Sequence, residues 1–89
     1  MDVQTVVTVK VGPAALRVYD TIAGKDATQM DIAAAYAGAI LSGEEIDWPA
    51  INQAILDRYG YAPRALKRIK KMAWALVEVR RRAIRMAAP

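Results

Sequence analysis

The amino-acid sequence predicts a mainly α-helical fold, with one N-terminal strand followed by about four helices. Valine and threonine recur at every second residue from Thr5 to Val11, which is the period of a strand with one buried face. Four later segments repeat apolar residues at helical spacing and begin and end at capping residues. The chain has 89 residues and no cysteine, so its core is modest and no disulfide reinforces it. We therefore expect the strand to pair between subunits.

The predicted strand has two distinct sides. Thr5, Val7, Val9 and Val11 lie on one side, and the other carries Gln4, Val6, Thr8 and Lys10. Gly12-Pro13 ends the strand, and no second strand pattern follows. A single strand leaves its backbone groups without partners. A second copy of the chain is the simplest partner, so we expect a homodimer or a higher oligomer.

Two helices are predicted in the first half of the chain. Pro13 suits the first turn of a helix that ends near Gly24. Thr28 and Asp31 fit a capping box, with Thr28 as N-cap, and open a second helix that stops at Ser42-Gly43. The second helix is rich in alanine, so we expect another helix to approach it closely.

Two further helices complete the predicted fold. Asp47 is a good N-cap for a helix over residues 48–59, and Gly60 suits the left-handed residue that ends it. Pro63 begins a long helix that runs to about Met86. We predict one domain over residues 1–89, in which residues 3–43 form a strand-helix-helix dimerisation unit and residues 44–89 are helical.

The charge is distributed unevenly. Residues 1–63 hold four basic and eight acidic side chains, whereas residues 64–89 hold nine basic side chains and one acid, Glu78. The C-terminal segment is therefore +8 within a chain of net charge +4. A polyanion is the partner that such a segment favours, because each phosphate that is neutralised releases a counterion.

The last predicted helix separates an apolar arc from a basic arc. Its expected nucleic-acid contacts are Arg64, Lys67, Arg68, Lys70, Lys71, Trp74, Arg81, Arg82 and Arg85. Trp74 lies within the basic arc, where an indole can stack on a base or enter a pocket of a partner. Arg80 falls in the apolar arc, so we expect it to meet a carboxylate or a neighbouring subunit.

The order of strand, helix, polar turn and capped helix over residues 3–43 resembles the ribbon–helix–helix family of dimeric repressors. In that family, two N-terminal strands form an antiparallel ribbon that enters the major groove of DNA. The resemblance implies that Gln4, Val6, Thr8 and Lys10 face the base edges. Of these, Thr8 and Lys10 have side chains suited to hydrogen bonding with bases. The resemblance also places Thr28 and Gln29 near the phosphate backbone.

A second DNA-binding arrangement is open further along the chain. Residues 52–71 also fit a helix-turn-helix, with Gly60 in the turn. In that arrangement, the side chains facing the groove are Arg64, Lys67, Arg68 and Lys71.

These patterns favour a small oligomeric protein that binds duplex DNA, such as a repressor. The alternative is a protein-interaction or assembly module that uses the alanine-rich helix together with Trp48 or Trp74. We expect no enzymatic activity and no cofactor, because the chain has no histidine, no phosphate-binding glycine loop and no pattern of metal ligands. It also has no membrane-spanning apolar run and no signal-peptide pattern, so we expect a cytoplasmic location.

Overall fold

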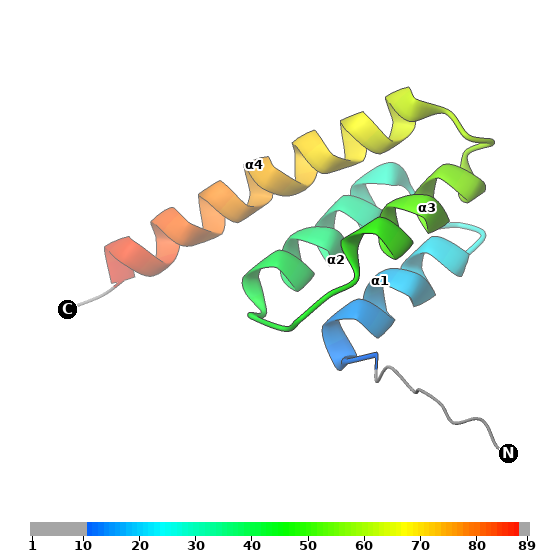
Figure 1. Ribbon diagram of the computed structural model, residues 1–89. Coiled ribbons are helices and arrows are strands. Elements are labelled where there is room, and N and C mark those ends of the chain that lie inside the picture. The colour runs from blue at the N-terminus through cyan, green and yellow to red at the C-terminus, as the bar shows by residue number, and fades with distance from the viewer. Residues whose placement is uncertain (1–10, 88–89) are drawn as a thin grey trace, which may run out of the picture.

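The computed structural model describes residues 11–87 and contains four helices (Figure 1). In chain order these are α1 (Pro13–Ala23), α2 (Gln29–Leu41), α3 (Trp48–Arg58) and α4 (Pro63–Ala87). Helix α2 packs against both α1 and α4, and α3 also contacts both α1 and α4. The long helix α4 extends past the end of α2, so its C-terminal part lies outside the helical body (Figure 1).

The predicted mixed fold with an N-terminal strand is wrong for the described part of the chain. Residues 11–87 are all-helical and contain no strand. The segment predicted to form the strand lies outside the described residues, except for Val11, which precedes α1 in an irregular conformation. The observed core is built from packed helices, and no described element of it is a sheet.

The predicted caps of α2 and α3 are confirmed. The Thr28 hydroxyl accepts a hydrogen bond from the Asp31 amide at 3.1 Å, and the Asp31 carboxylate accepts one from the Thr28 amide at 2.9 Å. The Asp47 carboxylate accepts a hydrogen bond from the Ala50 amide at 3.1 Å. Helix α3 ends at Arg58, one residue before the predicted end.

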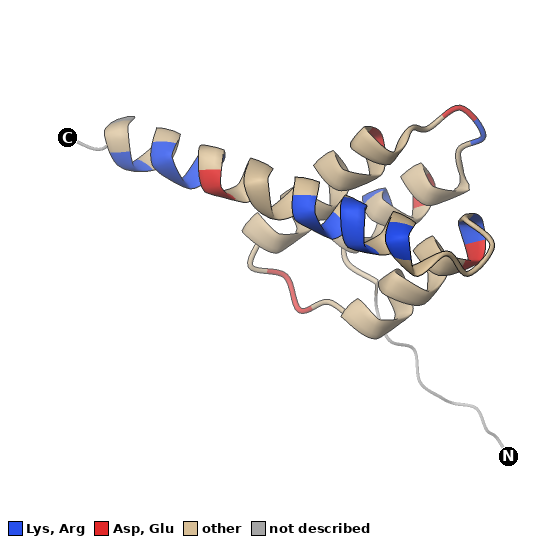
Figure 2. Ribbon diagram, turned by 90° about the horizontal axis from the view of Figure 1, so that it is seen from above, with Lys and Arg blue, Asp and Glu red and all other residues tan. Residues whose placement is uncertain are grey.

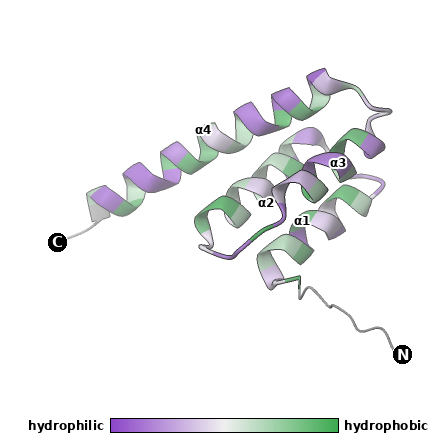
Figure 3. Ribbon diagram, viewed as in Figure 1, coloured by the Kyte–Doolittle hydropathy of each residue, from purple (hydrophilic) through white to green (hydrophobic). Residues whose placement is uncertain are grey.

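Helix α2 lies at the centre of the packing. It is largely hydrophobic around its circumference, whereas α4 shows separate hydrophobic and hydrophilic stripes (Figure 3). A helix that is apolar on several sides is stable when neighbours cover those sides, as α1 and α4 do here. Ala33 and Ala37 are fully buried, which confirms the close helix–helix contact expected of this segment.

Glu44 supplies the N-terminal cap that α1 lacks. No side chain of the N-cap residue, Gly12, can cap the helix. The Glu44 carboxylate instead accepts hydrogen bonds from the Ala14 and Ala15 amides at 3.0 and 2.9 Å. A Cβ atom on Gly12 would overlap this carboxyl group, so glycine is the residue that lets Glu44 approach.

Arg58 plays the matching part at the other end of α1. Its guanidinium donates hydrogen bonds to the backbone oxygens of Ile22, Gly24 and Ala27, the last two at 2.8 and 2.7 Å. A negative charge at the N-terminus and a positive charge at the C-terminus both oppose the helix dipole favourably. Helix α1 is thus held at both ends by side chains from distant parts of the chain.

Candidate nucleic-acid interface

The N-terminal half of α4 is fixed to the body along one side. Ala65, Ile69, Ala73 and Val77 recur every fourth residue and are buried. The opposite side of the helix therefore faces outward. Four basic residues of this half, Arg64, Lys67, Arg68 and Lys71, are exposed. We call these four residues the proximal basic face.

The C-terminal half of α4 carries a second basic segment. Figure 2 shows it separated from the proximal basic face by turns without Lys or Arg. Residues 78–86 are all exposed, so Val77 is the last buried residue of the described helix. Arg81, Arg82 and Arg85 belong to this exposed part, which we call the distal segment.

The structure describes nine of the eleven predicted contact residues. Eight of the nine on α4 are exposed, Trp74 among them at 50 %, whereas Lys70 is half-buried. The remaining two predicted contacts, Thr8 and Lys10, lie outside the described residues. All the predicted contact residues that the structure describes therefore lie on α4, and all but Lys70 and Trp74 belong to the proximal basic face or the distal segment.

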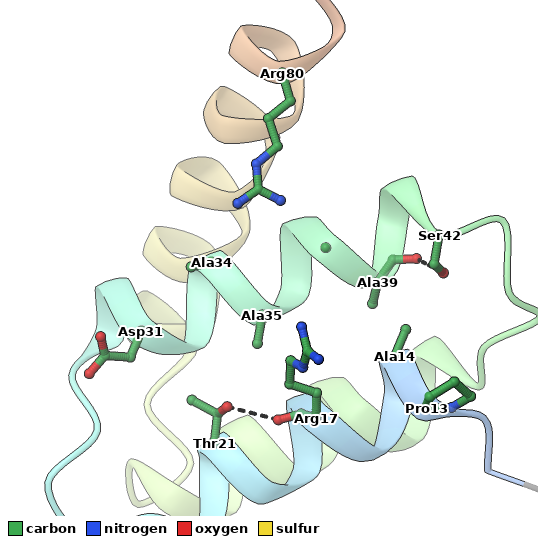
Figure 4. A pocket seen from close by; sticks show the side chains of 11 residues that line it. Pro13, Ala14, Arg17, Thr21, Asp31, Ala34, Ala35, Ala39, Ser42 and Arg80 are labelled. Carbon is green, nitrogen blue, oxygen red and sulfur yellow. Dashed lines mark hydrogen bonds between the residues drawn. The ribbon is translucent and has the colours of Figure 1, made fainter. Parts of the chain in front are cut away.

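Arg80 does not lie with the other basic side chains of α4. It projects over a groove of about 600 Å³ between α1, α2 and α4 (Figure 4). Arg17 of α1 lines the same groove, and so does Asp31, whose carboxylate caps α2. The expectation that Arg80 meets a carboxylate or a neighbouring subunit stays a prediction.

Helices α3 and α4 are joined by a tight turn of four residues, 59–62. Gly60 has φ +64°, which fits its predicted left-handed conformation, and Tyr61 follows with φ +61°. The Tyr61 amide donates to the Leu56 oxygen at 2.6 Å, and the Gly60 amide donates to the Asp57 oxygen at 3.4 Å. These two bonds are those of a Schellman motif, with glycine at the position that favours it.

This turn positions the proximal basic face. Ile55 before the turn and Ile69 after it are fully buried, so the two helices share one core. A short glycine turn joins the two helices both in αα-hairpins and in helix-turn-helix motifs. In a helix-turn-helix, the second helix presents its first turns to the major groove. In α4, those first turns carry Arg64, Lys67 and Arg68.

A pocket that no local sequence pattern predicts borders the proximal basic face. A pocket of about 340 Å³ lies between α2, α3 and α4. Its lining includes Tyr36, Trp48, Asn52, Lys70 and Trp74, which we call the tryptophan pocket. The five residues come from three helices, so their spacing along the chain gives no signal that they meet.

Hydrogen bonding and burial fix the polar part of this pocket. The Tyr36 hydroxyl donates to the Asn52 side-chain oxygen at 2.9 Å, and the Tyr36 ring lies 4.7 Å from the Trp48 ring between centroids. Burial raises the pKa of the Tyr36 phenol above its ordinary value of 10.0. The phenol is therefore protonated at neutral pH and acts as a donor.

Neither a membrane-spanning helix nor a metal site is found in the described residues. No helix within residues 11–87 is both long and apolar enough to cross a membrane, since α4 is long but strongly charged. The described residues contain no group of three acidic, histidine or cysteine side chains arranged to hold a metal ion. Comparison of the chain with protein-family models, curated proteins and solved structures finds no match.

Proposed function

We propose that the protein binds duplex DNA through α4, with the proximal basic face as the main contact surface. One observation carries the proposal: four exposed basic side chains project from a helix whose other side is fixed in the core. The backbone of this part of α4 is already ordered by the core, so binding costs little further backbone ordering. Arginine and lysine side chains are common hydrogen-bond donors to phosphate oxygens. The α3–α4 turn supports insertion of the first turns of α4 into the major groove.

The distal segment adds to the electrostatic attraction in this proposal. Helix α4 has 25 residues, which corresponds to about 37 Å at 1.5 Å per residue. A helix of that length reaches from a groove across the neighbouring phosphate backbone. Arg81, Arg82 and Arg85 then serve as phosphate contacts that carry no sequence information.

The test is fluorescence anisotropy of a labelled duplex across a salt series. We expect log affinity to fall linearly with log salt, by about 0.9 for each phosphate contact. Lys67→Ala/Lys71→Ala is expected to weaken binding and to reduce the slope by up to about 2. Arg17→Ala/Lys25→Ala is the matched control, because it removes the same charge from exposed sites outside α4. Equal effects of the two double variants would contradict a defined contact surface.

The second candidate function is a protein-interaction module. Part of the alanine-rich face of α2 is already used inside the fold, because Ala33 and Ala37 are buried. The observation that favours this candidate is instead the distal segment, where Val79, Ile84 and Met86 are 62–86 % exposed. Binding that persists at high salt and is lost on substitution of these apolar residues would favour it over DNA. Self-association through the N-terminal segment also stays a prediction.

A further inference from the structure

The tryptophan pocket contains both tryptophans of the chain. Trp48 begins α3 and Trp74 lies on α4, yet they line one pocket with Tyr36 of α2. Its volume of about 340 Å³ falls at the lower end of the range for small-molecule sites. Trp74 is half-exposed although it is one of the largest apolar side chains of the protein. Its exposed surface is available to a ligand with a flat apolar face.

The polar groups of the pocket favour a ligand that is aromatic and anionic. The side-chain oxygen of Asn52 accepts the hydrogen bond from the Tyr36 hydroxyl, so the two N–H groups of its amide nitrogen remain to donate to a ligand. Lys70 also lines the pocket, and its positive charge disfavours a cationic ligand. Glu44 also lines the pocket, but both of its oxygens accept hydrogen bonds from the start of α1. An aromatic ring that bears hydrogen-bond acceptors and a phosphate matches these groups.

The pocket is continuous with the proximal basic face. Lys70 and Trp74 are four residues apart on α4 and so are neighbours on its surface, and Lys67 and Lys71 flank them. A phosphate chain lying along these lysines passes the opening of the pocket. Aromatic side chains beside a basic track are the usual means of holding unpaired bases.

We propose that the tryptophan pocket binds an unpaired nucleobase of a nucleic acid whose phosphates lie on α4. This inference rests on the proposed function for the phosphate contacts of α4, and it extends the ligand from duplex DNA to nucleic acid with at least one unstacked base. The base stacks on Trp74, and an acceptor atom on the edge of the base accepts a hydrogen bond from the Asn52 amide nitrogen. The phosphate of the same nucleotide pairs with Lys70.

The experiment compares a twelve-nucleotide oligothymidylate with an abasic sugar-phosphate chain of the same length. Tryptophan fluorescence and anisotropy are followed in the full-length protein. We expect quenching with oligothymidylate only, and an affinity for it on the order of tenfold above that for the abasic chain. Trp74→Ala is expected to remove this preference, and Trp74→Phe to restore part of it. Met30→Ala is the control, because Met30 is an exposed apolar side chain of α2 that does not line the pocket.

The outcomes separate this proposal from the proposed function. Equal affinity for the two chains without quenching, together with salt-dependent duplex binding, would overturn the base pocket and leave the DNA surface intact. Quenching by oligothymidylate that Trp74→Ala abolishes, in a protein that binds neither duplex nor abasic chain, would support the pocket and overturn the DNA surface. The comparison of oligothymidylate with the abasic chain uses the unaltered protein, so its result is valid even if a variant folds poorly.

Discussion

At the residue scale, Glu44 and Arg58 hold the two ends of α1 by reaching across the fold. Glu44 lies 30 and 29 residues from the amides it accepts from, and Arg58 lies 31–36 residues from the oxygens it donates to. Each charge also has the sign that the neighbouring helix end favours. These contacts tie the α2–α3 connection and the end of α3 to α1, so their loss affects the position of three helices.

Replacing Glu44 by alanine is expected to lower the free energy of unfolding by about 1–2 kcal/mol, because two amides of α1 lose their acceptor. Urea denaturation followed by circular dichroism measures the change. Glu45→Ala is the matched control, since Glu45 is the adjacent exposed carboxylate; its effect is expected to stay within about 0.5 kcal/mol. Similar losses for the two variants would mean that Glu44 does not act as a cap.

Tyr36 gives the protein a predicted sensitivity to alkaline pH. Burial raises the pKa of its phenol above 10.0 in the folded state, whereas the unfolded chain titrates near 10. Above that pH the unfolded state releases its proton first, so stability is complete below pH 10 and falls as the pH rises through the folded pKa.

The comparison of Tyr36→Phe with the unaltered protein isolates this effect. At about pH 8 the variant is expected to be less stable by about 1 kcal/mol, because the hydrogen bond to Asn52 is lost. At about pH 11 the difference is expected to shrink, because only the unaltered protein loses the contribution of the buried phenol. Free energies of unfolding at the two pH values test this, and a constant difference would contradict it.

At the scale of elements, the turn between α3 and α4 sets where the basic helix starts. Gly60 occupies the left-handed position of a Schellman motif and has open space around it. An alanine there meets no neighbouring atom, but it must adopt a conformation that costs an L-residue about 1–2 kcal/mol. The strain is therefore in the backbone alone.

Gly60→Ala is expected to lower the free energy of unfolding by about 1 kcal/mol. Gly38→Ala is expected to raise it by up to about 1 kcal/mol, since Gly38 lies within α2 and a Cβ there also has open space. The same chemical change thus has opposite signs at the two sites. Thermal or urea unfolding of the two variants measures this, and a gain in stability for Gly60→Ala would refute the role given to the turn.

The features of the fold that the sequence predicts are those that depend on residues close together in the chain. Thr28, Asp31 and Asp47 act on amides only three residues away, so their caps follow from local patterns. The roles of Glu44 and Arg58 depend on residues about 30 positions away, so no local pattern marks them. The basic helix was predictable because charge and period lie within one segment. The tryptophan pocket was not, because three helices must pack before its residues meet.

The apolar arc of α4 marks a further limit of prediction from period alone. At helical spacing the apolar residues of α4 continue through Ala83 and Ile84, yet residues 78–86 are all exposed. Helical period determines which residues share a side, but the extent of α2 and α3, the helices in contact with α4, determines how far the body covers it. Val77 is the last buried residue of α4 in the described range.

At the scale of the whole molecule, α4 joins a compact helical body to an exposed basic extension. The body fixes the N-terminal half of α4 through Ala65, Ile69, Ala73 and Val77. The exposed half carries four arginines and no buried side chain in the described range. Stability and polyanion binding are therefore expected to depend on different halves of one helix.

A chain that ends at Glu78 tests this separation. Its free energy of unfolding is expected to stay within about 0.5 kcal/mol of the full chain, because the removed residues bury no described side chain. Its affinity for duplex DNA is expected to fall, with a salt slope that is lower by up to about 3. Of the four arginines that are removed, Arg81, Arg82 and Arg85 are proposed phosphate contacts, whereas Arg80 projects over the groove beside α2.

Replacement of the same four arginines by glutamine separates charge from length in this test. We expect the glutamine variant to match the truncated chain in salt slope, because the phosphate contacts need the charge of the segment and not its presence alone. A large loss of stability on truncation would instead show that the distal segment packs against another surface, such as a second copy of the chain. In that case the exposed Val79, Ile84 and Met86 would be the first residues to substitute, because they are its most exposed large apolar side chains.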